Sequence, residues 1–146
     1  MSIEIREAHW PEDLPLLREV REEVFVREQH VPADMEWDTS DPVAVHLLAE
    51  TPDGQPVGTV RLLPDGQIGR MAVLPEWRNQ GTGRRLMEQI MSKASELRYP
   101  KLFLNAQTRA VPFYRQFGFR TQGEEFMEAG IPHLRMEMDN DDNYRT

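Results

Sequence analysis

The chain of 146 residues contains no cysteine, which excludes disulfides, thiolate metal sites and a cysteine nucleophile. It has no run of 18 apolar residues, so no transmembrane helix is expected. Its opening, MSIEIREAHWPEDL, lacks the basic start and apolar core of a signal peptide. Basic side chains are few: 17 Lys and Arg against 25 Asp and Glu give a net charge of −8, which argues against nucleic-acid binding. These absences predict a cytoplasmic protein that contacts neither membrane nor nucleic acid.

The length favours one domain spanning residues 1–146, enough chain to bury about 70 % of its unfolded surface. Alternation predicts strands, and helical spacing predicts helices at residues 10–29, after residue 83 and at 110–117. The acidic end, residues 139–146, is expected to fray. The sequence therefore predicts an α/β (α+β) fold with a mixed, mostly antiparallel sheet of about six to seven strands and about four helices. The expected strands are residues 2–8, 44–51, 57–63, 68–74, 101–107 and 133–138.

A glycine-rich turn stands between a strand and a helix in VLPEWRNQGTGRRLME. Glycines there let backbone N–H groups turn outward, and the helix start adds unpaired donors and partial positive charge. A P-loop would need Gly-x4-Gly-Lys-Ser/Thr, which is absent, and a dinucleotide fingerprint would need a small residue where Leu86 stands. The remaining pattern is Arg/Gln-x-x-Gly-x-Gly/Ala, present as Arg78 to Gly83.

With Val73 and Pro75 in place before it, this pattern resembles the coenzyme A site of the GNAT N-acetyltransferases, and the chain is similar to small bacterial members of the glyphosate N-acetyltransferase type. The resemblance implies the GNAT fold and acetyl-CoA as co-substrate. It also implies that consecutive backbone amides hold the pyrophosphate. The residues concerned are Arg78, Asn79, Gln80, Gly81, Thr82, Gly83 and Arg84.

The same resemblance covers LNAQTRAVPFYRQFGF, where Asn105 would contact the pantetheine arm and Tyr114 would protonate the departing thiolate. A phenol suits that step because its ordinary pKa (~10) is near that of a thiol. The alternative for Tyr114 is a core residue with its hydroxyl at the rim. Phe113, expected in the core, is counted with the coenzyme A contacts. The oxyanion donors would be backbone N–H groups of the strand at Met71, Ala72 and Val73.

His133 follows Pro132 where the last predicted strand begins. In related GNAT enzymes a Pro-His at this point carries the histidine that deprotonates the amine, and histidine suits that work near neutral pH. A histidine that is merely hydrogen-bonded at a strand start is an equal alternative. Acidic candidates for the same role are Glu28, Glu36 and Asp38.

The helix at residues 10–29 and the loop after it would cover the acceptor end of the cleft in a GNAT fold. Acceptor contacts are expected from Arg21, Phe25, Glu28, Glu36 and Asp38. The loop is not an EF-hand, since Thr39 stands where the glycine should be, and the histidines show no ligand spacing, so no metal is predicted. The acidic loop inclines the prediction slightly toward a cationic small molecule.

The resemblance implies transfer of the acetyl group of acetyl-CoA to a primary amine by direct attack in a ternary complex. A different class stays open, namely a coenzyme A binding module or sensor without chemistry, which would need the glycine turn but neither Tyr114 nor His133. A minor alternative is an acyltransferase like the acyl-homoserine-lactone synthases, which share Arg-x-x-x-Phe and Glu-x-Asp-x-x-Asp. A homodimer is possible for such folds, and no segment of the sequence establishes it.

Overall fold

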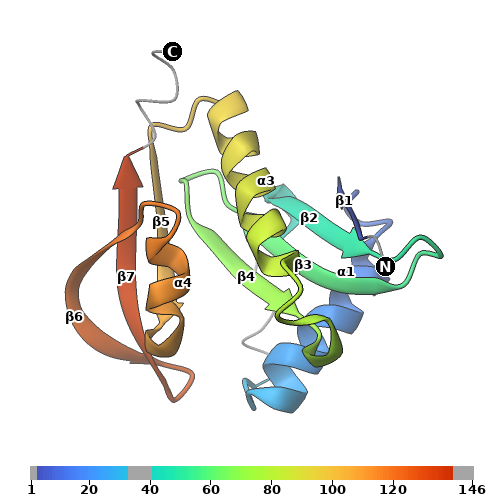
Figure 1. Ribbon diagram of the computed structural model, residues 1–146, viewed down its shortest axis with the longest axis horizontal. Coiled ribbons are helices and arrows are strands. Elements are labelled where there is room, and N and C mark those ends of the chain that lie inside the picture. The colour runs from blue at the N-terminus through green and yellow to red at the C-terminus, as the bar shows by residue number, and fades with distance from the viewer. Residues whose placement is uncertain (1–2, 33–40, 140–146) are drawn as a thin grey trace.

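The strands form two sheets in the computed structural model, which describes residues 3–32 and 41–139 (Figure 1). One sheet has four strands in the order β1-β2-β3-β4, and the other has three in the order β5-β7-β6. All pairings inside the two sheets are antiparallel within the described residues. The strands are β1 (Glu4–Glu7), β2 (Val45–Glu50), β3 (Pro56–Leu62), β4 (Ile68–Val73), β5 (Lys101–Gln107), β6 (Arg120–Glu128) and β7 (Ile131–Asp139).

The helices cover both faces of the four-stranded sheet, with α3 in front and α1 behind in Figure 1. At the end of β4, Ala72 and the next residue after the strand, Leu74, pack against Val20 and Val24, whereas Val73 between them faces the start of α3. This alternation follows from the two-residue period of a strand. The helices are α1 (Leu14–Arg21), the π-helix η1 (Glu22–Glu28), α3 (Thr82–Glu96) and α4 (Val111–Arg115), with single 3₁₀ turns η2 (Asp41–Val43), η3 (Pro75–Trp77) and η4 (Thr108–Ala110).

The two sheets meet at one point, where β4 and β5 begin. A parallel bridge joins Gln67 to Phe103, and the Phe103 N–H donates to the Gly66 carbonyl at 3.2 Å. Beyond this bridge the two strands form no ladder within the described residues, and they diverge in Figure 1. Each strand therefore keeps one edge of backbone groups that no strand pairs.

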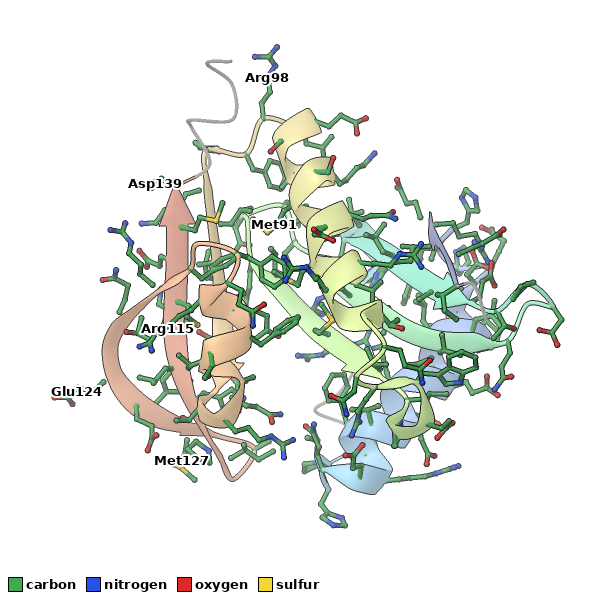
Figure 2. The ribbon with its side chains drawn as sticks, viewed as in Figure 1. Met91, Arg98, Arg115, Glu124, Met127 and Asp139 are labelled. Atoms are coloured by element: carbon green, nitrogen blue, oxygen red, sulfur yellow. The ribbon has the colours of Figure 1, made fainter. Side chains whose placement is uncertain are left out.

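The predicted α/β architecture is confirmed, with three corrections. The single predicted sheet is two sheets. The strand β6 was not expected, because it is an almost entirely exposed edge strand whose sequence does not alternate; Glu124 and Met127 point away from the body (Figure 2). The helix expected over residues 10–29 begins at Leu14 and changes to a π-helix at Glu22. Of the tail, Asp139 is the last residue of β7, and residues 140–146 lie outside the described part.

Gly66 is predicted to be essential at the junction of the sheets. Its φ is +95° and a Cβ there would overlap the Lys101 carbonyl oxygen, whereas Gly54, with φ +87°, has open space around it. Gly54→Ala is expected to lower the free energy of unfolding by about 1 kcal/mol through the left-handed backbone alone. Gly66→Ala adds a backbone clash and is expected to cost about 3 kcal/mol in all. Urea denaturation measures both, and equal losses would contradict the proposed steric constraint at the junction.

Candidate active site

The glycine turn presents a run of unused backbone donors. Asn79 and Gly81 have left-handed backbones, with φ of 61° and 84°, and α3 begins directly after them without a side-chain cap. The first amide of this segment that is bonded is that of Arg85, which donates to the Gly81 carbonyl at 3.0 Å. Within the described residues, the amides from Asn79 to Arg84 donate no hydrogen bond. Such a cluster at a helix N-terminus is suited to an anion.

The two glycines of the turn have different reasons to be there. Gly81 needs its left-handed φ, and a Cβ on it would meet nothing within 4 Å. Gly83 has an ordinary helical backbone, and its Cβ would make only normal contacts, 3.6 Å from Phe113 Cζ and 3.9 Å from Val73 Cγ2. The described protein atoms therefore do not require glycine at position 83. Close approach by a ligand does explain it.

The strand β4 offers further donors beside the turn. A register shift between β3 and β4 accompanies a left-handed Arg70, with φ 49°. The Leu74 N–H donates to the Val57 carbonyl on β3, so strand alternation directs the Val73 N–H group away from β3 and into the gap toward β5, whereas Met71 lies at the register shift itself. Ala72 is a correction to the predicted set, because its amide points to β3 and its side chain is buried.

Asn105 lies in the middle of β5 rather than at its end, and pairs with Arg135. Its side chain is on the sheet face opposite to buried Leu104, and makes no hydrogen bond within the described residues. Because the Phe103 N–H points to β4, alternation turns the backbone N–H of Asn105 into the same gap. The backbone N–H of Asn105, rather than its side chain, is therefore the donor that this residue offers to the gap between β4 and β5.

Tyr114 lies on α4, half-buried, with its ring edge-on to Phe113 at 5.1 Å and to Phe119 at 6.5 Å between centroids. Its hydroxyl makes no hydrogen bond within the described part of the chain. Burial raises the pKa of Tyr114 to about 12, so the phenol keeps its proton at neutral pH. The same shift makes it a weaker acid than free tyrosine, so its match to a thiol is poorer than the ordinary pKa suggests.

His133 is buried at the start of β7 and its ring stacks on Phe126 at 5.9 Å between centroids. Its Nδ1–H donates to the Ile131 carbonyl at 2.7 Å, which leaves Nε2 as the acceptor in the neutral ring, 3.6 Å from a Glu128 carboxylate oxygen. The hydrogen bond expected if His133 had only a structural role is thus present. It also fixes the tautomer that a general base needs.

A pocket of about 290 Å³ opens where η1 ends, β5 ends and β7 begins. Gln107 joins two of its walls: its Nε2 donates to Gln29 Oε1 at 2.7 Å, and its Oε1 accepts from Arg109 Nε at 3.1 Å. Sequence reasoning missed Gln29, Gln107 and Arg109, and no local pattern marked them. The lining residues are Glu28, Gln29, Gln107, Arg109, Ile131 and Pro132.

The Arg78 side chain connects the glycine turn to the pocket. Its Nε donates to the Val73 carbonyl at 2.8 Å, and its two terminal nitrogens donate to Glu28 at 2.8 and 2.6 Å. The Arg78 backbone N–H donates to the Pro75 carbonyl at 3.3 Å, so the run of unused amides begins at Asn79 and does not include Arg78. Hydrogen bonding from Arg78 lowers the pKa of Glu28, which makes this carboxylate a poorer base than expected.

The residues predicted to contact the acceptor differ in burial and in their partners. Arg21 is fully buried and donates to Asp41 at 3.0 Å, and Arg61 reaches the same carboxylate at 2.9 Å. The prediction that Arg21 contacts substrate is therefore corrected to a buried ion pair. Phe25 is partly buried against the cluster of Val20, Val24, Ala72 and Leu74. Glu36 and Asp38 lie outside the described residues.

Arg84 stands at the start of α3 with its guanidinium turned toward α4. It donates to Gln116 at 3.0 Å and lies 5.5 Å from the centroid of the Phe117 ring. Among residues 3–32 and 41–139, no group of three or more His, Asp or Glu is placed to hold a metal ion. In the same ranges no helix has the length and apolarity needed to cross a membrane.

Residues 10–140 match the family model described as Acetyltransferase (GNAT) domain. The uncharacterized N-acetyltransferase YjcF of Bacillus subtilis is 43 % identical over 125 residues, covering 82 % of this chain and 88 % of that protein. An acyl-CoA N-acyltransferase from Pseudomonas aeruginosa has a similar structure, with a TM-score of 0.84 and 34 % identity over 93 % of this chain and 99 % of that one. Escherichia coli ElaA gives a TM-score of 0.84, 28 % identity and the same two coverages.

We predict that Arg78 and Glu28 stabilise the protein together. A double-mutant cycle with Arg78→Gln and Glu28→Gln, measured by urea denaturation, is expected to give a coupling free energy of about 0.5–1 kcal/mol, since both side chains remain a third exposed. The matched cycle on the exposed pair Arg27 and Glu23 should give about 0.3 kcal/mol.

The coupling should depend on pH with a defined sign. The folded pKa of Glu28 lies below its unfolded value, so the stabilisation is present above the unfolded pKa and is lost as the pH falls through the folded pKa. A coupling of zero at neutral pH, or one that grows on acidification, would contradict the pairing.

Proposed function

Because the chain belongs to the GNAT acetyltransferase family and is an acyl-CoA-dependent N-acyltransferase, we propose that it transfers the acetyl group of acetyl-CoA to a primary amine of a small molecule. Direct attack in a ternary complex is the proposed route. One observation carries the proposal: the amides from Asn79 to Arg84 are consecutive and donate no hydrogen bond within the described residues. They suit the two phosphates of coenzyme A, which need many donors at short range.

The fit to acetyl-CoA extends along the gap between β4 and β5. A pyrophosphate on the glycine turn would lie against Gly83, where the missing side chain admits close approach. The pantetheine arm would then follow the unpaired strand edges, where the N–H groups of Val73 and Asn105 point. A backbone donor aimed at the thioester oxygen would stabilise the negative charge that develops there, an effect typically worth about 3–4 kcal/mol of barrier.

The proposed chemistry uses two proton transfers. The amine nitrogen attacks the thioester carbon, and His133 Nε2 takes the amine proton, directly or through water. The carbon–sulfur bond breaks, and the Tyr114 hydroxyl gives its proton to the departing thiolate. The tautomer of His133 and the protonated, unbonded hydroxyl of Tyr114 support these assignments. Absence of cysteine rules out an acetyl-cysteine intermediate.

The subgroup, the location and the oligomeric state of the protein are predicted from its sequence. The likeness to the glyphosate N-acetyltransferase type, the cytoplasmic location and the possible homodimer stay predictions. The acyl-homoserine-lactone-synthase alternative loses support because Arg21 and Asp41, two of its five residues, form a buried pair. The alternative is a coenzyme A binding module without catalytic activity. It differs from the proposed enzyme in needing neither Tyr114 nor His133.

Binding of acetyl-CoA is the first expected outcome. Calorimetric titration of the purified protein should give saturable binding of acetyl-CoA, with no binding of NAD, and ATP at most weak. No binding at millimolar acetyl-CoA would refute the assignment of the glycine turn. Turnover is then measured by release of thiol, for which a protein without cysteine contributes no background.

Tyr114→Phe is expected to lower kcat about 100-fold, because the thiolate would leave without its proton donor. The Kd for acetyl-CoA should stay within about twofold of the unchanged protein, since the ring is retained. Tyr99→Phe is the matched control: it removes a hydroxyl beyond the other end of α3 and should leave kcat unchanged. Equal turnover in the Tyr114 and Tyr99 variants would remove the acid role and favour the core alternative.

A further inference from the structure

The pocket beside His133 has two charged groups in its lining, Glu28 and Arg109. They are not equivalent. Glu28 receives two short hydrogen bonds from Arg78, so its charge is already matched by a guanidinium. Arg109 donates from Nε to Gln107, which is neutral, and forms no ion pair with a carboxylate at salt-bridge distance within residues 3–32 and 41–139. The pocket lining therefore contains one guanidinium with no carboxylate in direct contact, although the charge of Arg109 also reaches Glu28 and contributes to lowering the pKa of that carboxyl.

The position of Arg109 is fixed by Gln107, which lies next to the proposed base His133. Gln107 and His133 are directly opposite each other on β5 and β7, so their side chains share one face of the three-stranded sheet. Gln107 is itself held from the other side by Gln29. With Nε of Arg109 occupied by Gln107, the two terminal nitrogens remain as a fork, the geometry that binds carboxylate or phosphate oxygens in pairs.

From this geometry we infer that the acceptor amine also carries an anionic group, a carboxylate or a phosphate, and that Arg109 binds that group while the amine lies at His133. The inference rests on the proposed acetyl transfer and names the substrate class for it: amino acids and amine phosphates rather than simple amines. It reverses the expectation of a cationic acceptor. That expectation used the acidic loop, in which Glu36 and Asp38 lie outside the described residues and Asp41 is buried with Arg21 and Arg61.

The test is a thiol-release assay at saturating acetyl-CoA with a defined set of acceptors. The probes are the L-amino acids, the corresponding amino acid amides, phosphoethanolamine and ethylamine. The amides keep the amine and side chain and lose only the negative charge. The variants are Arg109→Gln and Arg109→Lys, with Arg27→Gln as the control that removes one positive charge from an exposed position on η1.

The expected result is turnover of an amino acid or of phosphoethanolamine, with its amide or ethylamine counterpart used poorly. Arg109→Gln should raise KM for the anionic acceptor about 10- to 100-fold, the usual loss for a hydrogen bond to a charged group. Arg109→Lys should recover part of the loss, and Arg27→Gln should change KM less than twofold. The KM for acetyl-CoA should not move. A carboxylate preference and a phosphate preference identify which anion is bound.

The outcomes separate this inference from the proposed function. Equal use of amides and amino acids, or unchanged KM in Arg109→Gln, overturns the anion site while acetyl transfer stands. Acetyl-CoA binding without turnover of any anionic probe also counts against it. Failure to bind acetyl-CoA in calorimetry refutes the proposed function itself, and the anionic acceptor with it.

Discussion

The divergence of β4 and β5 after one bridge is the constraint on which the site depends. A continuous sheet would satisfy the backbone groups on the facing edges of β4 and β5 with each other, and no ligand would find a donor there. The junction at Gly66 keeps the two sheets together at one end, and the unpaired edges face each other at the other end. The glycine turn follows directly after β4. The phosphate donors and the strand-edge donors therefore form one continuous path.

The Arg78 side chain holds the end of β4 and the end of η1 in a fixed relative position. Its backbone belongs to the turn, its Nε holds the carbonyl of Val73, and its terminal nitrogens hold Glu28 at the rim of the pocket. One side chain thus positions the end of β4 and the end of η1 against each other. A side chain that only bound phosphate would not need these three contacts. A glutamine at position 78 could not make all three at once.

Sequence reasoning predicted the elements whose patterns are local. The bounds of β5 were predicted correctly, and α3 was predicted to begin after residue 83 and begins at Thr82, because apolar alternation, glycine and helical spacing are all read within a few residues. Sequence-based prediction failed where the helical period changed or where a residue's contact partner lay far away along the chain. The π-helix changes the faces that an α-helical count assigns to residues after Arg21. Arg21 itself is buried on the α-helical face of Leu17 and Val20, and its partner Asp41 lies 20 positions further along the chain. Gln29 and Gln107 meet across 78 positions of chain, which no local pattern records.

The charge of the pocket shows why net charge is a poor guide to a ligand. The chain has a net charge of −8, and its acidic loop inclined the sequence-based prediction toward a cationic acceptor. Charge acts at a site only where it is not already matched nearby, since exposed charges beyond about 10 Å are screened at ordinary ionic strength. In the lining of the pocket Arg78 pairs with Glu28, and the other charged lining residue is Arg109, while Glu128 lies outside the lining, 3.6 Å from His133 Nε2. These individual groups, rather than the net charge of the chain, are what an acceptor meets.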